Sequence, residues 1–189
     1  MSVIASLEAE YGRYKTLAEA AIAQLSDDEL TQAGPGGSNS IDMLVRHVAG
    51  NLQSRFSDFR TSDGEKPWRH RDDEFEPAAV SRNQLMEMWE RAWKVLFGAV
   101  SELRDPDLAQ TVTIRRQPLR IDEALHRSLA HTAYHVGQIV YLAKAIRGEA
   151  SWRCLSIPRG GSNAYNQAPV LERPSAYVAR DSKPIEPSS

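Results

Sequence analysis

The chain has 189 residues, of which 41% are hydrophobic and 25% charged, and this length and composition fit one globular domain with an additional segment. Its formal net charge is −2, with basic residues interspersed among acidic ones, so composition favours neither nucleic acid nor an acidic membrane surface as a partner. No stretch approaches the roughly 18 apolar residues of a membrane span, and the N-terminus lacks the apolar core of a signal peptide.

Cys154 is the only cysteine, which excludes an internal disulfide and fits a reducing compartment. We therefore expect the protein to be cytoplasmic. The neighbours of Cys154 in WRCLSIP are mostly apolar. We expect this cysteine to be a small buried side chain rather than a nucleophile.

Four segments carry apolar residues at helical spacing and predict four helices. Their approximate ranges are 3–25, 41–61, 82–103 and 122–147. Ser26 and Glu29 have the spacing of a capping box after the first segment. Ser40 or Asn39 can cap the second helix, and Ser81 the third. An all-α fold is the class that this pattern indicates.

The connections differ in character. Residues 34–39 (GPGGSN) predict a flexible connector, since no strand precedes them and the Lys-Ser/Thr end of a phosphate loop is absent. The polar stretch 62–77 is long enough for a crossover between the second and third helices. Residues 111–114 and 118–121 predict a short hairpin, which Pro118 weakens. From Ser151 onward we expect irregular structure.

Three of the five histidines have the placement that a metal site requires. His131 and His135 are four residues apart in HTAYH and therefore share a helix face. With about 100° of rotation per residue, His135 lies inside the apolar arc, and His131 lies at its edge. His47 lies beside the apolar arc of the second helix. His126 falls on the solvent side, and His70 is in the polar crossover.

Three neutral imidazoles around a divalent ion would leave a coordination position for water or substrate. The alternative is a set of hydrogen-bonded core histidines, because HxxxH without the zincin glutamate is a weak signal. Asn51 and Gln138 lie on the same helix edges and are either second-shell or substrate-binding groups or ordinary rim amides. Tyr134 is either an orienting hydroxyl or a packed surface residue.

Arginines near the histidine rows could hold an anionic substrate, although most helix arginines are only solvated. Those flanking the histidines are Arg46, Arg55 and Arg127. A second group of residues, not all of them arginines, could line the entrance of a pocket or simply pack in loops. Its members are Trp68, Arg69 and Arg71 in the crossover and Arg159, Asn163 and Asn166 in the tail.

Three segments of the chain resemble a known group of proteins. The segments NSIDMLVRHVAGNLQSRFSDFRTSDGEKPWRHRDDEFE, LAHTAYHVGQIVYLAK and WRCLSIPRGGSNAYN are similar to the DinB-like (YfiT-like) superfamily of metalloenzymes. Within it they are closest to a domain-of-unknown-function family. The resemblance covers nearly the whole chain except the last dozen or so residues, and the joint occurrence of three separated motifs is more specific than HxxxH alone.

The resemblance implies an up-down-down-up four-helix bundle that is often a homodimer. The resemblance also implies a divalent metal, zinc or nickel first among several, held by His47, His131 and His135. The bundle is expected to span residues 1–150. The apolar anchors in WRCLSIPRGGSNAYN predict that residues 151–178 pack on it, and the composition of residues 179–189 predicts a disordered tail. The superfamily includes S-transferases and isomerases that use bacillithiol, mycothiol or glutathione.

Three functions remain open from the sequence. The first is a metal-dependent S-transferase that uses a small thiol and a small-molecule substrate. The second is a metal-dependent hydrolase, against which stands the absence of an acid from the HxxxH segment. The third is a non-catalytic, metal-binding, stress-associated dimer. A homodimer is also expected because Trp89, Trp93 and Phe97 spread over more than one face of their helix.

Overall fold

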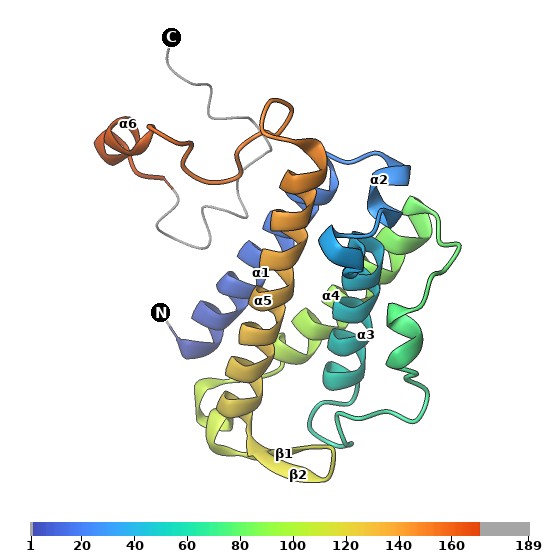
Figure 1. Cartoon of the computed structure of the whole chain (residues 1–189). Helices are drawn as coiled ribbons and strands as arrows, with labels where there is room; N and C mark the ends of the chain where they lie inside the picture. The colour runs from blue at the N-terminus through green and yellow to red at the C-terminus, as the bar shows by residue number, and fades with distance from the viewer. Residues whose placement is uncertain (1, 171–189) are drawn as a thin grey trace.

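The computed structural model describes residues 2–170 and is mostly helical. Four long helices lie side by side (Figure 1). Six α-helices, three 3-10 helices and two strands occur in that part of the chain: α1 Val3–Ile22, α2 Asp27–Thr31, η1 Pro35–Gly37, α3 Ile41–Phe56, η2 Asp72–Phe75, α4 Arg82–Ser101, η3 Asp105–Ala109, β1 Thr111–Ile114, β2 Gln117–Arg120, α5 Ile121–Arg147 and α6 Ser162–Gln167.

The four long helices run up, down, down and up, as predicted (Figure 1). Arg82, at the start of α4, donates to the carbonyl of Ile22 at the end of α1, so these two helices are antiparallel. Tyr11 donates to the carbonyl of Leu125 over 2.8 Å, which joins the early turns of α1 and α5. The residues between α3 and α4 therefore form the long crossover that parallel neighbours need.

The helix starts follow the capping chemistry in the sequence. Ser26 and Glu29 form a capping box at α2, and Ser81 forms one with Gln84 at α4. Ser40 occupies the cap position of α3, but its hydroxyl is hydrogen-bonded to the Asp42 carboxylate rather than to a backbone amide. The predicted boundaries hold within about three residues except at the end of α3.

Two sequence expectations were wrong in detail. The predicted helix 41–61 ends at Phe56, because Ser57 is extended and Asp58 has φ +49°, which a right-handed helix does not accommodate. Cys154 is exposed rather than buried, since in its segment only Trp152 and Leu155 pack against the core. The segment after residue 151 also contains the short helix α6, none of whose residues is buried. The tail from residue 171 lies outside the described residues.

One chain buries two of the three aromatic side chains of α4 that had suggested a dimer. Trp89 and Trp93 are both 0% exposed, and Phe97 packs partly against the core. Trp93 contacts the Tyr11 ring edge-on, with centroids 6.4 Å apart. Only Phe97 of the three keeps exposed surface, and the homodimer stays a prediction.

The hairpin β1–β2 joins α4 to α5 at one end of the bundle, with Thr111 paired to Arg120 (Figure 1). Its two-residue turn has positive φ at both Arg115 and Arg116, the conformation of a type I′ turn. This conformation is uncommon for residues other than glycine. The Asp63 carboxylate stabilises it by accepting the amide N–H groups of Arg115 and Arg116 over 2.8 and 2.7 Å.

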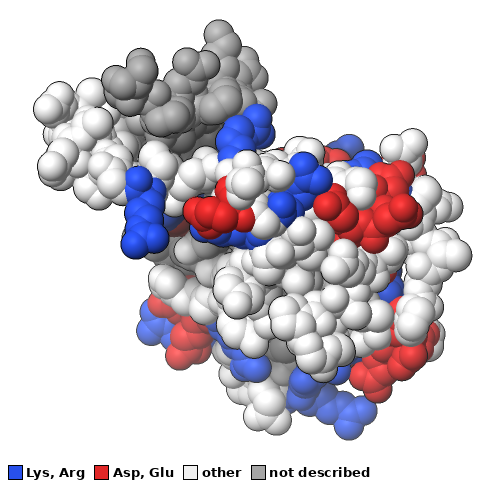
Figure 2. Space-filling view, turned by 45° about the horizontal axis from the view of Figure 1, so that its top comes forward, with Lys and Arg blue, Asp and Glu red and all other residues white. Residues whose placement is uncertain are grey.

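The outer surface is electrostatically mixed. Acidic and basic side chains occur next to one another on the face drawn in Figure 2. This agrees with the near-neutral composition. No helix among residues 2–170 is long and apolar enough to pass through a lipid bilayer.

Candidate metal centre

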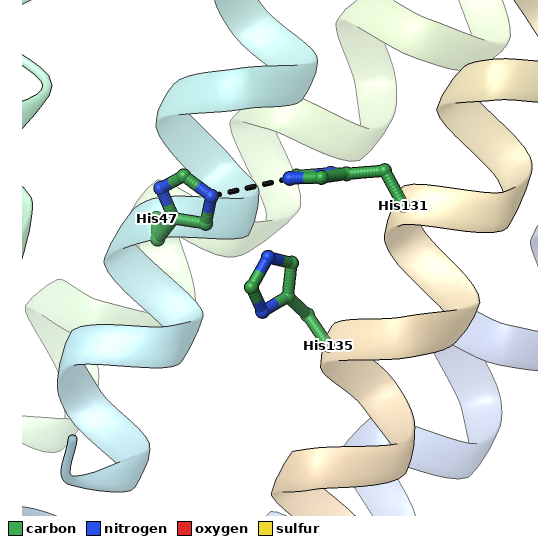
Figure 3. A group of neighbouring side chains, drawn as sticks. All are labelled: His47, His131 and His135. Atoms are coloured by element: carbon green, nitrogen blue, oxygen red, sulfur yellow. Dashed lines mark hydrogen bonds between the residues drawn. The ribbon is translucent and has the colours of Figure 1, made fainter. Parts of the chain in front are cut away.

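Two helices bring three histidines together. His47 lies on α3, while His131 and His135 lie one turn apart on α5, and their rings converge in the space between the two helices (Figure 3). One ring nitrogen from each residue lies within 4.8 Å of the other two. His47 and His135 are buried and His131 is half-buried. The three are therefore close enough to bind one metal ion.

The spacing of the nitrogens fits a metal ligand set. Nε2 of His47 and Nε2 of His131 are 3.2 Å apart. Two nitrogens that bind one tetrahedral zinc at about 2.1 Å are roughly 3.4 Å apart. The ring centroid of His135 is 4.5 Å from that of His131 and 4.7 Å from that of His47. The Nε2 atoms of His47 and His131 therefore already have about the separation that one zinc ion requires, and the ring of His135 faces them.

The electrostatics keep two of these imidazoles neutral. Burial, followed by the charges of His135 and His47, lowers the pKa of His131 to about 3. Burial and the charge of His47 also lower the pKa of His135, although the hydrogen bond with Gln138 opposes this shift. A neutral imidazole is the form that binds a metal ion, so both side chains are ready ligands at neutral pH.

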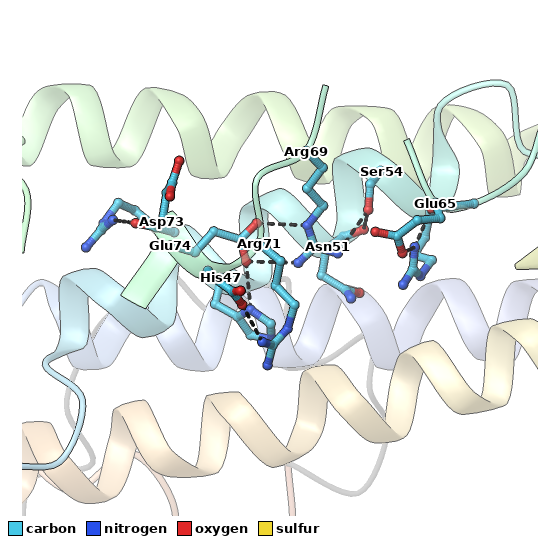
Figure 4. Close-up of polar contacts among 12 residues, drawn as sticks. His47, Asn51, Ser54, Glu65, Arg69, Arg71, Asp73 and Glu74 are labelled. Carbon is cyan, nitrogen blue, oxygen red and sulfur yellow. Dashed lines mark hydrogen bonds and ion pairs between the residues drawn. The ribbon is translucent and has the colours of Figure 1, made fainter. Parts of the chain in front are cut away.

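A glutamate from the crossover orients His47. The Glu74 carboxylate, on η2, lies 2.8 Å from Nδ1 of His47 (Figure 4). Because a carboxylate only accepts, Nδ1 carries the proton and the lone pair of Nε2 faces the other histidines. Arg69 donates from Nε and Nη2 to the same carboxylate over 2.8 and 2.9 Å. Burial raises the pKa of Glu74, but these hydrogen bonds outweigh it and lower the pKa overall.

The carboxylate of Glu74 reaches His47 only because a glycine faces it. A Cβ placed on Gly50, in α3, would lie 2.1 Å from Oε1 of Glu74. Such a contact is far below the van der Waals limit, so any side chain there would displace the carboxylate. Arg46 also secures the crossover, donating to the carbonyls of Asp73 and Glu76 over 2.9 and 2.6 Å.

His135 is oriented by a residue of its own helix, α5. Nδ1 of His135 lies 2.8 Å from the amide oxygen of Gln138, so Nδ1 donates and Nε2 is free to bind a metal. The amide nitrogen of Gln138 donates to the hydroxyl of Tyr134 over 3.3 Å. Nδ1 of His131 is buried and has no hydrogen-bond partner within residues 2–170.

The histidines open onto a cavity of about 470 Å³. Its lining includes the polar residues predicted near the site, Asn51, Gln138, Tyr134, Arg55 and Arg127, together with Arg69, Arg71 and Arg115. Phe56, Phe59 and Phe75 supply apolar wall. No Asp or Glu of the described chain lines this cavity.

Several sequence-predicted residues lie elsewhere. Arg46 is buried against Asp42 and the crossover and does not line the cavity, so it occupies neither of the two positions considered for it, a substrate contact or a solvated helix surface. Trp68 is exposed and outside the lining. His70 and His126 are exposed, as predicted. The tail residues Arg159, Asn163 and Asn166 are exposed and do not line the cavity either.

Glu74 and Gly50 are the residues of the candidate site that the sequence did not reveal. Glu74 is 27 positions from His47 and lies in a segment without helical periodicity. The only signal was the length of the polar crossover, which marks a loop but not the residue that reaches the site.

Fold and site define a helical bundle with a candidate three-histidine metal centre. The chain belongs to the family described as a protein of unknown function (DUF1572), whose model matches residues 2–161. Neither a search of curated proteins nor one of solved structures found a match.

Proposed function

We propose that this protein is a divalent-metal-dependent enzyme in which His47, His131 and His135 hold the ion and a small thiol is the co-substrate. The observation that carries the proposal is the convergence of three ring nitrogens within 4.8 Å at a cavity. Zinc and nickel are the metals proposed first, because imidazole suits both. The protein would act as a homodimer, as the resemblance to DinB-like proteins implies, and in the cytoplasm, which its single cysteine favours.

The chemistry of the cavity favours a thiol over water as the nucleophile. A divalent ion at the three histidines would favour the thiolate form of a bound thiol at neutral pH. Metal-dependent hydrolysis usually also needs a general base, and no carboxylate among the described residues lines the cavity. Glu74 does not fill that role, because its carboxylate is engaged by His47 and Arg69.

In the proposed reaction the thiol loses its proton to solvent and its sulfur forms a bond to an electrophilic carbon. The bond from that carbon to the leaving group breaks, and the leaving group departs with the electron pair. Asn51 and Gln138 line the cavity and could orient the electrophile. The three histidines would remain ligands throughout.

Metal content tests the site. Each of the five histidines is replaced by alanine, and the metal per chain is measured in protein prepared without added metal or a histidine tag. We expect about one ion per chain in wild type, His70→Ala and His126→Ala. Loss of metal is expected in His47→Ala, His131→Ala and His135→Ala. Retention in all three of those variants would refute the site.

Thiol conjugation tests the reaction. Bacillithiol, mycothiol, glutathione and coenzyme A are each supplied with monochlorobimane, and wild type is compared with His135→Ala and metal-stripped protein. Metal-dependent conjugation with one thiol is the expected result. No conjugation with any thiol, alongside turnover of ester or amide substrates, would establish the hydrolase instead. Inactivity in both assays would favour a metal-binding protein without catalysis.

A further inference from the structure

The helical rows of α3 and α5 change from histidine to arginine along the cavity, whereas Arg69 and Arg71 of the crossover line it beside the histidines. On α3 the residues His47, Asn51 and Arg55 follow one another at intervals of four, and on α5 Arg127, His131 and His135 do the same. Residues four apart share a helix face. All six line the same cavity. Because α3 and α5 are antiparallel, the arginines of both rows lie at the end opposite the histidine cluster, near the β1–β2 hairpin (Figure 1).

Helical rise sets the distance between the two ends. Arg55 is eight residues from His47, which is about 12 Å along the axis of α3. Arg127 is four residues from His131, which is about 6 Å along α5. Arg115 of the hairpin turn also lines the cavity. Arg55 and Arg127 thus stand about one to two helical turns away from the histidines.

The carboxylates near this end do not neutralise it. The Glu65 carboxylate is shared between Arg55, at 3.1 Å, and Arg115, at 2.8 Å. The side chain of Arg127 makes no hydrogen bond or ion pair with any residue between 2 and 170. Asp63, which accepts the backbone N–H groups of Arg115 and Arg116, is the other carboxylate near this end. Three cavity-lining guanidinium groups against these two carboxylates leave an excess of positive charge, and a cavity lined by one sign of charge concentrates counter-ions.

We propose that the arginine end binds a carboxylate or phosphate group of the substrate, with Arg127 as the principal contact. Guanidinium groups bind these anions in a bidentate manner. The reacting atom of the same molecule would lie at the histidines, and the phenylalanine walls would contact an apolar portion between the two. The inference rests on the proposed function for the reacting end, but the anion site itself needs no metal.

Calorimetric titration of the full-length protein with matched probes tests this site. Phenylacetate and phenyl phosphate are the anionic probes, and phenylacetamide is the neutral analogue. Wild type should bind the anions more tightly than the amide, and added salt should weaken the binding. Arg127→Gln should weaken anion binding about tenfold, since a hydrogen bond to a charged group is lost. The tighter of the two anions identifies the preferred group.

Arg91→Gln is the matched control, because Arg91 is an exposed arginine of α4 outside this cavity, and its affinity should equal that of wild type. Equal binding of phenylacetamide, or an unchanged affinity in Arg127→Gln, would overturn the proposal. The variant His135→Ala distinguishes anion binding at the arginines from anion binding at the metal. If His135→Ala still binds the anionic probes, the result supports the arginine site. If His135→Ala loses anion binding and Arg127→Gln keeps it, the anion binds the metal instead.

Discussion

The carboxylate of Glu74 lies 2.8 Å from Nδ1 of His47, so a crossover residue determines which nitrogen of a core histidine faces the cavity. The contact joins η2 to α3 and is supported by the paired hydrogen bonds from Arg69. The predicted metal centre therefore depends on a loop as well as on two helices.

Replacing Glu74 by glutamine should lower the affinity for metal by about 10- to 100-fold, the usual effect of losing a carboxylate behind a metal-bound histidine. The amide cannot accept equally well from both His47 and Arg69. Competition titration against a chromophoric chelator measures the change. Glu76→Gln is the matched control, since the exposed Glu76 contributes only its backbone carbonyl to Arg46. An equal loss in both variants would contradict the role assigned to Glu74.

Gly50→Ala should reproduce the metal-binding defect of Glu74→Gln. The new Cβ would lie 2.1 Å from Oε1 of Glu74, so the carboxylate must leave its position against Arg69 and His47. Gly98→Ala on α4 is the control, because no atom lies within 4 Å of a Cβ there. Gly98→Ala should keep wild-type affinity and gain up to about 1 kcal/mol of stability from helix propensity. Wild-type affinity in Gly50→Ala would show that the contact is dispensable.

Metal should stabilise the folded chain. An ion that binds only the folded state adds about 2.7 kcal/mol at a free concentration one hundred times its Kd. For a chain of this length that corresponds to a rise in Tm of roughly 5 to 10 °C. Thermal unfolding with and without zinc measures it. His135→Ala should show no such rise, and an equal rise in that variant would place the ion elsewhere.

Acid should destabilise the metal-free protein through its histidines. The pKa of His131 is lowered to about 3 in the folded chain, from an ordinary value of 6.5. Below pH 6.5 the unfolded chain binds a proton that the folded chain does not, so the free energy of unfolding falls as the pH falls from 6.5 toward 3. Above that range this contribution is constant.

Urea unfolding of metal-free wild type and His131→Gln at pH 7.5, 6 and 5 isolates this effect, because the carboxylates are common to both proteins. Wild type should lose more stability than His131→Gln over that range. If the free energy of unfolding falls equally with pH in the two proteins, His131 titrates normally in the folded state.

Periodicity was enough to predict the inward histidines, since a helix face is a local property of the chain. The same rule separated His47, His131 and His135 from the exposed His126, and it placed Asn51 and Gln138 at the cavity. The all-α class and the course of the four long helices followed from the same pattern and the resemblance.

Contacts through irregular segments could not be predicted in this way. Glu74 approaches His47 through a crossover whose path depends on Arg46, Arg69 and the space above Gly50. Arg46 looked like a residue of the cavity because its neighbour in the sequence is His47, yet its side chain turns toward the crossover. Long-range packing decides such positions, and a single sequence carries no periodic signal for it.

Docking of the crossover on α3 should be thermodynamically coupled to metal binding. Thermodynamic reciprocity requires that, if docking of Glu74 strengthens ion binding, ion binding must strengthen docking by the same factor. Arg71, an exposed residue three positions before Glu74, would then be cut by trypsin more slowly in the metal-loaded protein. Slower cleavage of the peptide bond after Arg71 would thus report whether the metal centre is occupied.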